Sequence, residues 1–379
     1  MPLGLYVHYP FCQHLCSYCT SCQVLHSRDL EKQFFQALIT ETELTAEKLV
    51  SDDTIISSIY VGGGTPSLAS LDLFADWLEH LKHHFKILEN VEFTLEFNPE
   101  SATRGNLTAF KELGVNRPIF GVQTFDSCLL KILHRKHTAH HSHRAIYCAY
   151  AIGYRNFGVD LIFGVPTQTS RRLSADLDQL LDLEPPHITI RQLTLKPGTR
   201  LAEKVTGGNL RMPGHELIQA MYRGNCERLS EAGYVRYEVS SFAKPGFECH
   251  HKLDYWEGND LLGLGLSAHS FIDGEHFLNV TDLGTYIEQL KTSRLPRVPD
   301  RVGVEKLMIE AIAEGLRTTR GINRSRFSDR FGVPIEARLN RSLYYQLVES
   351  GHLLPELGNL RLSDTGILQV DEITKKLIE

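Results

Sequence analysis

The sequence LGLYVHYPFCQHLCSYCTSC, which runs from Leu3 to Cys22, joins an apolar run typical of a β-strand to a loop rich in cysteine. Cys12, Cys16 and Cys19 follow a C-x3-C-x2-C spacing. Zinc motifs usually consist of two separated C-x2-C pairs, or of one pair with later histidines, and no matching second pair follows here. Three thiolates on one loop can hold three irons of a 4Fe–4S cube, which leaves the fourth iron open to an exchangeable ligand. We expect Tyr18 to shield the edge of that cluster. A zinc knuckle, or thiols without metal, is the alternative.

The cysteine spacing resembles the signature of the radical S-adenosylmethionine (SAM) superfamily. In that superfamily the open iron binds the amino and carboxyl groups of SAM, and the reduced cluster cleaves SAM to a carbon radical. The string Tyr6-Val-His8-Tyr-Pro10-Phe11-Cys12 resembles, more narrowly, the Y-x-H-x-P-F-C string of the oxygen-independent coproporphyrinogen III oxidase-like family. The resemblance implies that Cys12, Cys16 and Cys19 are the cluster ligands.

The composition is that of a globular protein, with 42% hydrophobic and 23% charged residues in a chain of 379. A formal net charge of −6 argues against a nucleic-acid surface, which requires a basic domain. Eight cysteines in a chain of this length do not form a disulfide scaffold. The chain starts without the charged and apolar segments of a secretory signal, and it has no apolar run long enough to span a bilayer. We therefore expect a cytoplasmic protein with no integral membrane segment and no nucleic-acid partner.

Strand-like apolar runs alternate with helix-like patterns along the first half of the chain. After the first strand, the predicted strands lie at Ile55–Val61, Val91–Glu96, within Asn116–Phe125, at Phe157–Phe163 and at His187–Leu195. Six strand–helix units in series predict a parallel sheet with helical crossovers. Six units rather than eight predict an open, partial barrel.

Glycine and polar residues stand at the ends of these strands. Gly62-Gly63-Gly64 follows the second strand, Glu96 closes the third, Gln123 closes the fourth, and Asp160 lies in the fifth. Ligands of parallel sheets bind at the carboxyl ends of the strands, so these residues are expected on one rim. The glycines form either a tight turn or a close backbone approach to a small ligand. A buried Asp160 needs a partner, either the hydroxyl groups of a ribose or a core arginine.

Through the resemblance, the fold class is α/β: a partial (β/α)6, TIM-like radical SAM barrel with a smaller C-terminal domain that is helical and winged-helix-like. The resemblance also implies a set of SAM contacts on this rim: Tyr6, Gly63, Gly64, Thr65, Glu96, Gln123, Arg135 and Asp160.

The segment Cys249–Trp256, CHHKLDYW, is the second stretch that carries chemistry. Cysteine and histidine can serve as axial ligands, and the Tyr–Trp pair offers flat aromatic surface, so the segment suits a porphyrin. It resembles the H-N-x-x-Y-W motif of the haem chaperone branch of the family, with Lys252 where that motif has asparagine. The match falls on His251, Tyr255 and Trp256. The resemblance implies a haem contact at His251, with Cys249 and His250 as alternatives. An aromatic cluster with solvated histidines is the non-binding alternative.

Two further stretches need an interpretation. A run of histidines is a candidate metal or haem site, although the local sequence favours a helix that starts with Thr138 as its N-cap. The run comprises His134, His137, His140, His141 and His143. The segment Gly263–Ser270 resembles the family's G-x-G-x-x-A-H-S string, and we expect it to close over the site.

Residues beyond about Gly198 change character. Helices are expected at Glu305–Leu316, Ser325–Phe331 and Ile335–Ser350, with short strands at Leu353–Leu354 and Asn359–Leu362. We therefore expect three domains. Residues 1–200 form the radical SAM core with the cluster and SAM site, 201–300 form a family-specific extension with the haem motif, and 301–379 form the winged-helix-like domain.

The resemblance covers two classes of protein. One is an enzyme that converts coproporphyrinogen III to protoporphyrinogen IX, and the other is a chaperone that binds haem and transfers it to an acceptor protein. The chaperone is favoured because Tyr6 lacks the N-terminal extension of the oxidases, because Ser21 stands where they have a fourth cysteine, and because the motif at His251 belongs to the chaperone branch. The extra thiol, Cys22, matches neither class. A radical SAM enzyme acting on another tetrapyrrole is a third alternative.

The chaperone interpretation implies its cofactors and partners. The cofactors are a 4Fe–4S cluster, SAM and haem. The partners are haem, an acceptor protein, and an electron donor such as a flavodoxin or a ferredoxin.

Overall fold

The computed structural model describes residues 2–49, 51, 53–300, 303–356 and 358–378. The chain forms two compact units. The first joins Met1–Met221 to Asp260–Asp300, and the second joins Tyr222–Asn259 to Arg301–Glu379. The chain therefore leaves the first unit, returns to it, and leaves it again.

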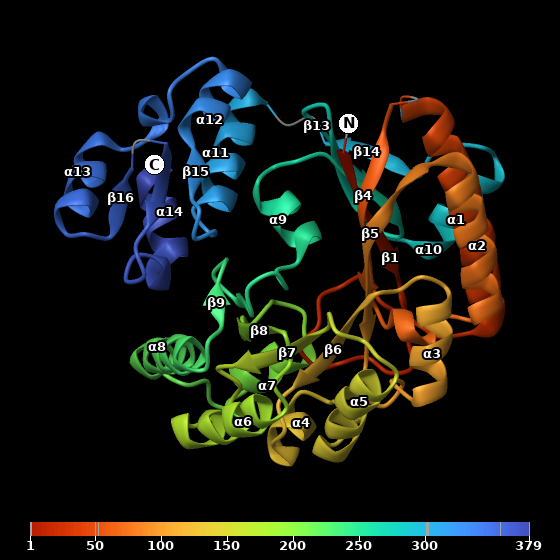
Figure 1. The fold of residues 1–379 in the computed structure, drawn as a ribbon, viewed down its shortest axis with the longest axis horizontal. Coiled ribbons are helices and arrows are strands. Elements are labelled where there is room, and N and C mark those ends of the chain that lie inside the picture. Colours follow the sequence, from red (N-terminus) through yellow and green to blue (C-terminus); the bar gives the residue numbers. More distant parts are fainter. Residues whose placement is uncertain (1, 50, 52, 301–302, 357, 379) are drawn as a thin grey trace. The chain divides into compact units, whose positions relative to one another are not determined.

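Six parallel strands form the centre of the first unit, as the alternation of strand and helix patterns predicted (Figure 1). Their order in the sheet follows their order in the chain: β1 (Pro2–Tyr9), β4 (Ile55–Gly63), β5 (Lys86–Phe97), β6 (Arg117–Gln123), β7 (Gly158–Phe163) and β8 (His187–Gln192). The helices between and after them are α1 (Arg28–Leu49), α2 (Leu71–His84), α3 (Arg104–Glu112), α4 (Ser127–Ile132), α5 (Ala139–Ala151), α6 (Ser170–Asp182) and α7 (Arg200–Thr206). The α/β class and the partial barrel are confirmed.

Aromatic side chains hold the first two helices against the sheet. Phe34 and Phe35 on α1 and Phe74 and Trp77 on α2 are each at most 2% exposed. Burial of a side chain of this size contributes about 1.5–3 kcal/mol. Phe34 and Phe35 pack against Tyr9 of β1. The helices therefore fix the strand from which the cysteine loop emerges.

The segment Gly263–Ser270 does not close over the site as expected. Its first part belongs to β11 (Leu261–Gly265), which pairs in parallel with the free edge of β1. The antiparallel strands β12 (His269–Ile272), β13 (Glu275–Asn279) and β14 (Arg297–Asp300) then extend the sheet, and α10 (Leu283–Lys291) lies between the last two. Glycine is needed at position 263 because a Cβ there would lie 2.3 Å from the carbonyl oxygen of His269.

A buried carboxylate fixes this added part of the sheet. Glu41 on α1 accepts hydrogen bonds from the Gly265 amide at 2.8 Å, from Asn279 Nδ2 at 2.6 Å and from the Tyr286 hydroxyl at 2.6 Å. Burial raises the pKa of Glu41. Residues 260–300 therefore belong to the same compact unit as the barrel. The division into three domains at residues 200 and 300 stays a prediction.

The second unit contains a small antiparallel sheet surrounded by helices. The sheet has the order β15 (Ile322–Asn323), β17 (Asn359–Leu362), β16 (Leu353–Pro355). The helices are α9 (His250–Trp256), α11 (Val304–Gly315), α12 (Arg324–Phe331), α13 (Arg341–Glu349) and α14 (Val370–Ile378), together with the end of α8 (His215–Glu231). The short strands β9 (Val235–Arg236) and β10 (Ser241–Ala243) pair with each other. The helices α11, α12 and α13 with the small β-wing match the predicted winged-helix-like character, whereas α14 was not predicted.

One predicted helix of this unit is divided. Residues 335–350 form a short 3-10 turn, Ile335–Arg338, and then α13, instead of a continuous helix. Asn340 is the reason, because its side chain accepts a hydrogen bond from the Leu343 amide at 3.1 Å and so starts a new helix. Within the described ranges, no helix combines the length and the apolar character needed to cross a membrane.

Candidate functional site

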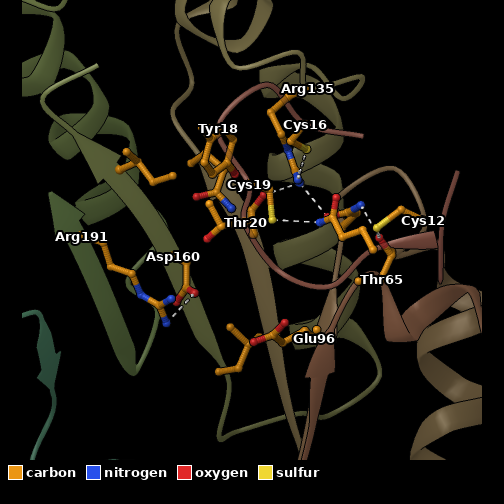
Figure 2. A pocket seen from close by; sticks show the side chains of 18 of the residues that line it. Cys12, Cys16, Tyr18, Cys19, Thr20, Thr65, Glu96, Arg135, Asp160 and Arg191 are labelled. Carbon is orange, nitrogen blue, oxygen red and sulfur yellow. Dashed lines mark hydrogen bonds and ion pairs between the residues drawn. The ribbon is translucent and has the colours of Figure 1, made fainter. Parts of the chain in front are cut away.

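A cavity of about 420 Å³ opens at the carboxyl ends of the parallel strands of the first unit (Figure 2). The cysteine loop and the ends of β4 to β8 line it, as the strand-end rule predicted. The predicted residues that line the cavity are Cys12, Cys16, Tyr18, Cys19, Gly63, Gly64, Thr65, Glu96, Gln123, Arg135 and Asp160. Tyr6 does not line it. The Tyr6 hydroxyl lies 3.1 Å from His8 Nδ1, beside the ring of Tyr60.

Each sulfur of the predicted cluster trio meets one hydrogen-bond donor. Thr65 Oγ1 lies 3.4 Å from Cys12 Sγ, and Arg135 Nη1 lies 3.5 Å from Cys16 Sγ. Gln23 Nε2 lies 2.9 Å from Cys19 Sγ. Donors of this kind stabilise a thiolate and tune a metal that the thiolate binds. Burial raises the pKa of the Cys12 thiol to about 11, so this thiol needs a metal ion to be a thiolate at neutral pH.

The cysteine loop is held at several points. The strands β2 (Phe11–Cys12) and β3 (Val24–Leu25) pair in parallel across its two ends. In its middle, the Ser17 amide donates to the Leu133 carbonyl at 3.2 Å, and the Ser17 carbonyl accepts from the Leu201 amide at 2.8 Å. The loop is therefore a braced structure, in which the three thiols have fixed positions.

The fourth thiol of the loop points to a different partner. Cys22 Sγ lies 3.0 Å from the carbonyl oxygen of Thr281, and the Cys22 carbonyl lies 3.1 Å from His8 Nε2. Cys22 does not line the cavity between the sheet ends and the cysteine loop.

The glycine turn packs against the cysteine loop. Gly63 has a φ of +108°, and a Cβ there would lie 2.8 Å from the His8 ring. A Cβ at Gly64 would lie 2.6 Å from the Phe11 carbonyl oxygen. The Thr65 amide donates to that same carbonyl at 2.9 Å, which places the Thr65 hydroxyl at Cys12. The tight turn and its close contacts with the cysteine loop thus require glycine at positions 63 and 64. The same two glycines also line the cavity.

Arg135 joins three segments of the site. Besides Cys16, its Nη2 donates to Asn98 Oδ1 at 2.6 Å and to the Gly121 carbonyl at 2.9 Å. Asn98 in turn donates to Thr65 Oγ1 at 3.2 Å. Asn98 and Gln23 were not among the predicted site residues. The position of Asn98, directly after β5, was the signal that sequence reasoning could have used.

The acidic residues of the rim differ in how they are satisfied. Glu96 Oε1 accepts from the Tyr60 hydroxyl at 2.7 Å. Asp160 Oδ2 lies 3.7 Å from Nη2 of Arg191, whose side chain is 53% exposed and is not a core residue. Asp160 Oδ1 is buried, faces the cavity, and has no hydrogen-bond partner among the described residues. A buried carboxylate oxygen without a donor is costly, so this atom suits the hydroxyl groups of a ligand.

Gln123 ends β6 in a strained backbone conformation. Its φ is +66°, a value that non-glycine residues seldom adopt, and the pairing of β6 with β7 shifts register there. Strain of this kind is concentrated at ligand sites.

Three histidines of the run, His137, His141 and His143, make local hydrogen bonds, in line with the helix-start interpretation. His141 Nδ1 lies 3.2 Å from the Thr138 amide and 2.9 Å from Thr138 Oγ1, which closes a capping box at the start of α5. His137 Nε2 lies 2.9 Å from the Val122 carbonyl, and burial lowers the pKa of His137 to about 3. His143 Nδ1 lies 2.8 Å from the Ala139 carbonyl.

The predicted haem motif lies on α9 of the second unit. Cys249 and His251 are buried, with exposures of 0% and 6%, whereas His250 is exposed. Tyr255 is 40% exposed, and its ring packs edge to face on Trp256 with centroids 4.9 Å apart. The motif therefore offers an exposed imidazole and an exposed aromatic ring on one short helix.

Comparisons with known proteins agree with the fold. Residues 6–180 match the family described as Radical SAM superfamily, and residues 304–368 match the HemN C-terminal domain. The solved structure of Escherichia coli coproporphyrinogen III oxidase (HemN), titled a radical SAM enzyme, superposes with a TM-score of 0.85 at 21% identity, over 100% of this chain and 90% of that one.

Sequence relatives extend over nearly the whole chain. The zebrafish (Danio rerio) protein named "Radical S-adenosyl methionine domain-containing protein 1, mitochondrial" is 32% identical over 99% of this chain and 86% of its own. The "Heme chaperone HemW" of Lactococcus lactis is 30% identical over 94% of this chain and 96% of its own. The protein of the same name from Bacillus subtilis is 31% identical over 97% of both chains. With that identity over nearly its full length, a radical SAM domain and a HemN C-terminal domain, the chain belongs to the HemW family of radical SAM proteins.

Proposed function

We propose that the protein is a haem chaperone, which binds haem and transfers it to an acceptor protein with the help of a 4Fe–4S cluster and SAM. The observation that carries the proposal is the similarity to relatives named heme chaperone HemW, which spans 97% of both chains in the Bacillus subtilis case and so includes the segment Cys249–Trp256. The likeness to HemN, at 21% identity, supports the fold alone.

The residues around the cavity fit a cluster and SAM. When bound and reduced, such a cluster supplies the electron that cleaves a carbon–sulfur bond of SAM. In the proposed arrangement Cys12, Cys16 and Cys19 bind three irons, and Thr65, Arg135 and Gln23 each stabilise one sulfur by a hydrogen bond. Asp160 Oδ1 would accept hydrogen bonds from the ribose hydroxyls, and Tyr18, which lines the cavity, would shield an edge of the cluster. Tyr6 stays a proposed SAM contact, although its hydroxyl lies 3.1 Å from His8 Nδ1 and it does not line the cavity.

Haem is proposed to bind at α9. We keep His251 as the proposed contact, although its burial requires α9 to shift before an iron can reach the ring. His250 is exposed and is therefore the principal rival, and Cys249, at 0% exposure, is the least accessible of the three. Tyr255 and Trp256 offer the aromatic surface on which a porphyrin can stack.

A basic surface beside the cysteine loop fits an acidic electron donor such as a flavodoxin or a ferredoxin. Burial and the charges of Lys204, Arg200 and Lys136 lower the pKa of His134, so these groups converge on one place. The segment ending at Leu133 and the start of α7 are the two that hydrogen-bond to Ser17 of the cysteine loop. A positive patch next to the cluster, in a chain of net charge −6, steers a negative partner to the position from which an electron travels least far.

The test is anaerobic reconstitution of the cluster followed by two assays on the same preparation. The first measures haem binding by absorption titration, and the second measures transfer of bound haem to an apo-haem protein. We expect stoichiometric haem binding and transfer. Haem affinity unchanged in His251→Ala, His250→Ala and Cys249→Ala would remove all three candidate ligands from the proposed site.

The alternative function is that of an oxygen-independent coproporphyrinogen III oxidase. It is tested on the same preparation with coproporphyrinogen III, SAM and a reductant, and Cys16→Ala serves as the inactive control. Decarboxylation above that control would overturn the chaperone proposal.

A further inference from the structure

We propose that Glu43, His80 and His84 bind a divalent transition metal ion on the helix pair α1–α2 of the first unit. Zn²⁺ is the ion that this site would take. The potential ligand atoms of the three side chains all lie within 4.8 Å of one another. Glu43 Oε1 lies 3.1 Å from His80 Nδ1 and 4.0 Å from His84 Nε2. A single carboxylate oxygen therefore faces two imidazole nitrogens.

The spacing of the two histidines explains how they meet. His80 and His84 are four residues apart on α2, so they project from the same face of the helix, one turn apart. Glu43 reaches this face from α1, which packs against α2. Paired histidines at i and i+4 with a third ligand from another element are a recurrent arrangement of zinc sites.

The two helices are held in register beside the site. Trp77 on α2 is fully buried, and its Nε1 donates to Thr42 Oγ1 at 3.2 Å. Thr42 precedes Glu43 directly, and Trp77 lies one turn before His80, so this bond fixes the two backbones that present the ligands. The second nitrogen of the His80 ring, Nε2, lies 3.9 Å from Asp76 Oδ1. A carboxylate at that distance can orient the ring of a metal-bound histidine, directly or through a water.

The chemistry of the ligands selects the ion. Imidazole and carboxylate together suit zinc, whereas magnesium and calcium prefer oxygen ligands alone. The three side chains are 26–39% exposed, so solvent can complete a four-coordinate shell.

The position of the site gives it a structural role. The helix α1 follows the cysteine loop, and α2 follows the glycine turn at Gly62-Gly63-Gly64. An ion bound between them would tie together the two helices behind the two turns that line the cavity. The inference does not depend on the proposed haem chemistry.

The test is a Zn²⁺ titration of the full chain against a chromophoric competing chelator. Cys12, Cys16 and Cys19 are replaced by serine in this background, so that the cluster thiols do not take up zinc. We expect His80→Ala and His84→Ala each to weaken the binding of one equivalent of Zn²⁺ by at least tenfold. Glu43→Gln, which keeps the shape of the side chain, should do the same.

The matched control is His83→Ala, which removes an exposed histidine from the same helix. It should leave both the stoichiometry and the Kd unchanged. The thermal midpoint of each variant without metal checks its folding, and added Zn²⁺ should raise that midpoint in the parent and in His83→Ala only. Equal zinc affinity in the parent and in all three ligand variants would overturn the site. An equal loss of zinc affinity in His83→Ala would mean that surface imidazoles bind zinc without forming a specific site.

Discussion

Asp160 carries the sharpest residue-level test of the proposed SAM site. Asp160→Asn keeps the size of the side chain but removes the charge from the buried Oδ1 atom that has no donor. A hydrogen bond to a charged group contributes about 1.5–3 kcal/mol, so the affinity for SAM should fall roughly tenfold to hundredfold. Equilibrium binding of SAM to the cluster-loaded protein measures this.

The control for that prediction is Asp182→Asn, at an exposed position on α6. Both variants should retain the iron content of the parent, because neither residue contacts a cysteine sulfur. Unchanged SAM affinity in Asp160→Asn would assign Asp160 to the ion pair with Arg191 alone.

A second residue-level prediction concerns the glycine turn. Gly63→Ala forces an L residue to a φ of +108° and brings its Cβ to 2.8 Å from the His8 ring. We expect a loss of stability of about 2 kcal/mol or more, seen as a lower urea midpoint, together with a lower yield of cluster.

The matched control is Gly105→Ala on α3, where a Cβ has no neighbour within 4 Å. Because alanine is the better helix former, this variant should be as stable as the parent or up to about 1 kcal/mol more stable. A Gly63→Ala protein with the parent's midpoint would contradict the packing argument.

For single residues, the sequence predicts those whose chemistry or spacing is unusual. It does not predict contacts that depend on the conformation of a loop. The cysteines, Asp160 and the glycine turn were predictable because thiol spacing, a charge inside an apolar strand and a glycine triplet are each unusual. Gln23 was not, because any polar residue at that position looks solvated until the loop brings it to Cys19 at 2.9 Å. Tyr6 was assigned to SAM through the resemblance, whereas its hydroxyl meets His8.

Among the elements, strands were predicted where a mostly apolar run stands between turn or helix patterns. The six parallel strands satisfy that condition, and the sheet order follows from alternation with helices. The strand β11 does not, because two of its five residues are glycines, which usually mark loops. Its pairing with β1 is a long-range contact that no local pattern contains.

The helix pair α9 and α11 carries a prediction about pH. Burial and the charge of Glu310 raise the pKa of Glu314 on α11 to about 7, from an ordinary value of 4.5, although a hydrogen bond with Tyr255 of α9 opposes the shift. Between these two values the folded protein holds a proton that the unfolded chain releases. The stability from this group is therefore complete below about pH 4.5 and is lost as the pH rises through 7.

Glu314→Gln cannot titrate and should remove this dependence. With a discount for solvent screening, we expect the variant to gain roughly 1–2 kcal/mol on the parent between pH 5 and pH 8. Urea unfolding at both pH values measures the gain, and Glu349→Gln, exposed on α13, is the control. Parallel pH profiles of the parent and Glu314→Gln would show that Glu314 is ionised throughout.

For the molecule as a whole, the balance of charge predicts how an electron donor docks. The double variant Lys136→Glu and Arg200→Glu reverses two charges of the basic surface beside the cysteine loop. Reduction of the cluster by an acidic flavodoxin should slow by at least about tenfold at low salt, and its dependence on ionic strength should weaken, because electrostatic steering is lost.

The control reverses two exposed lysines of α1, Lys32→Glu and Lys48→Glu, and changes the net charge by the same amount. It should reduce at close to the parent's rate. Equal slowing in both double variants would show that only the overall charge matters.

The return of the chain to its first unit has a consequence for biosynthesis. One edge of β1 pairs with β4 as soon as that strand has been made, but the other edge waits for β11, about 200 residues later. At about 5–20 residues per second, the ribosome needs roughly 10–40 s to supply it. During that interval the nascent chain presents an open strand edge next to its thiols, where a neighbouring polypeptide can add. Insertion of iron and sulfur is therefore best timed after residue 265 has left the exit tunnel, and a stalled translation product ending before β11 is expected to aggregate.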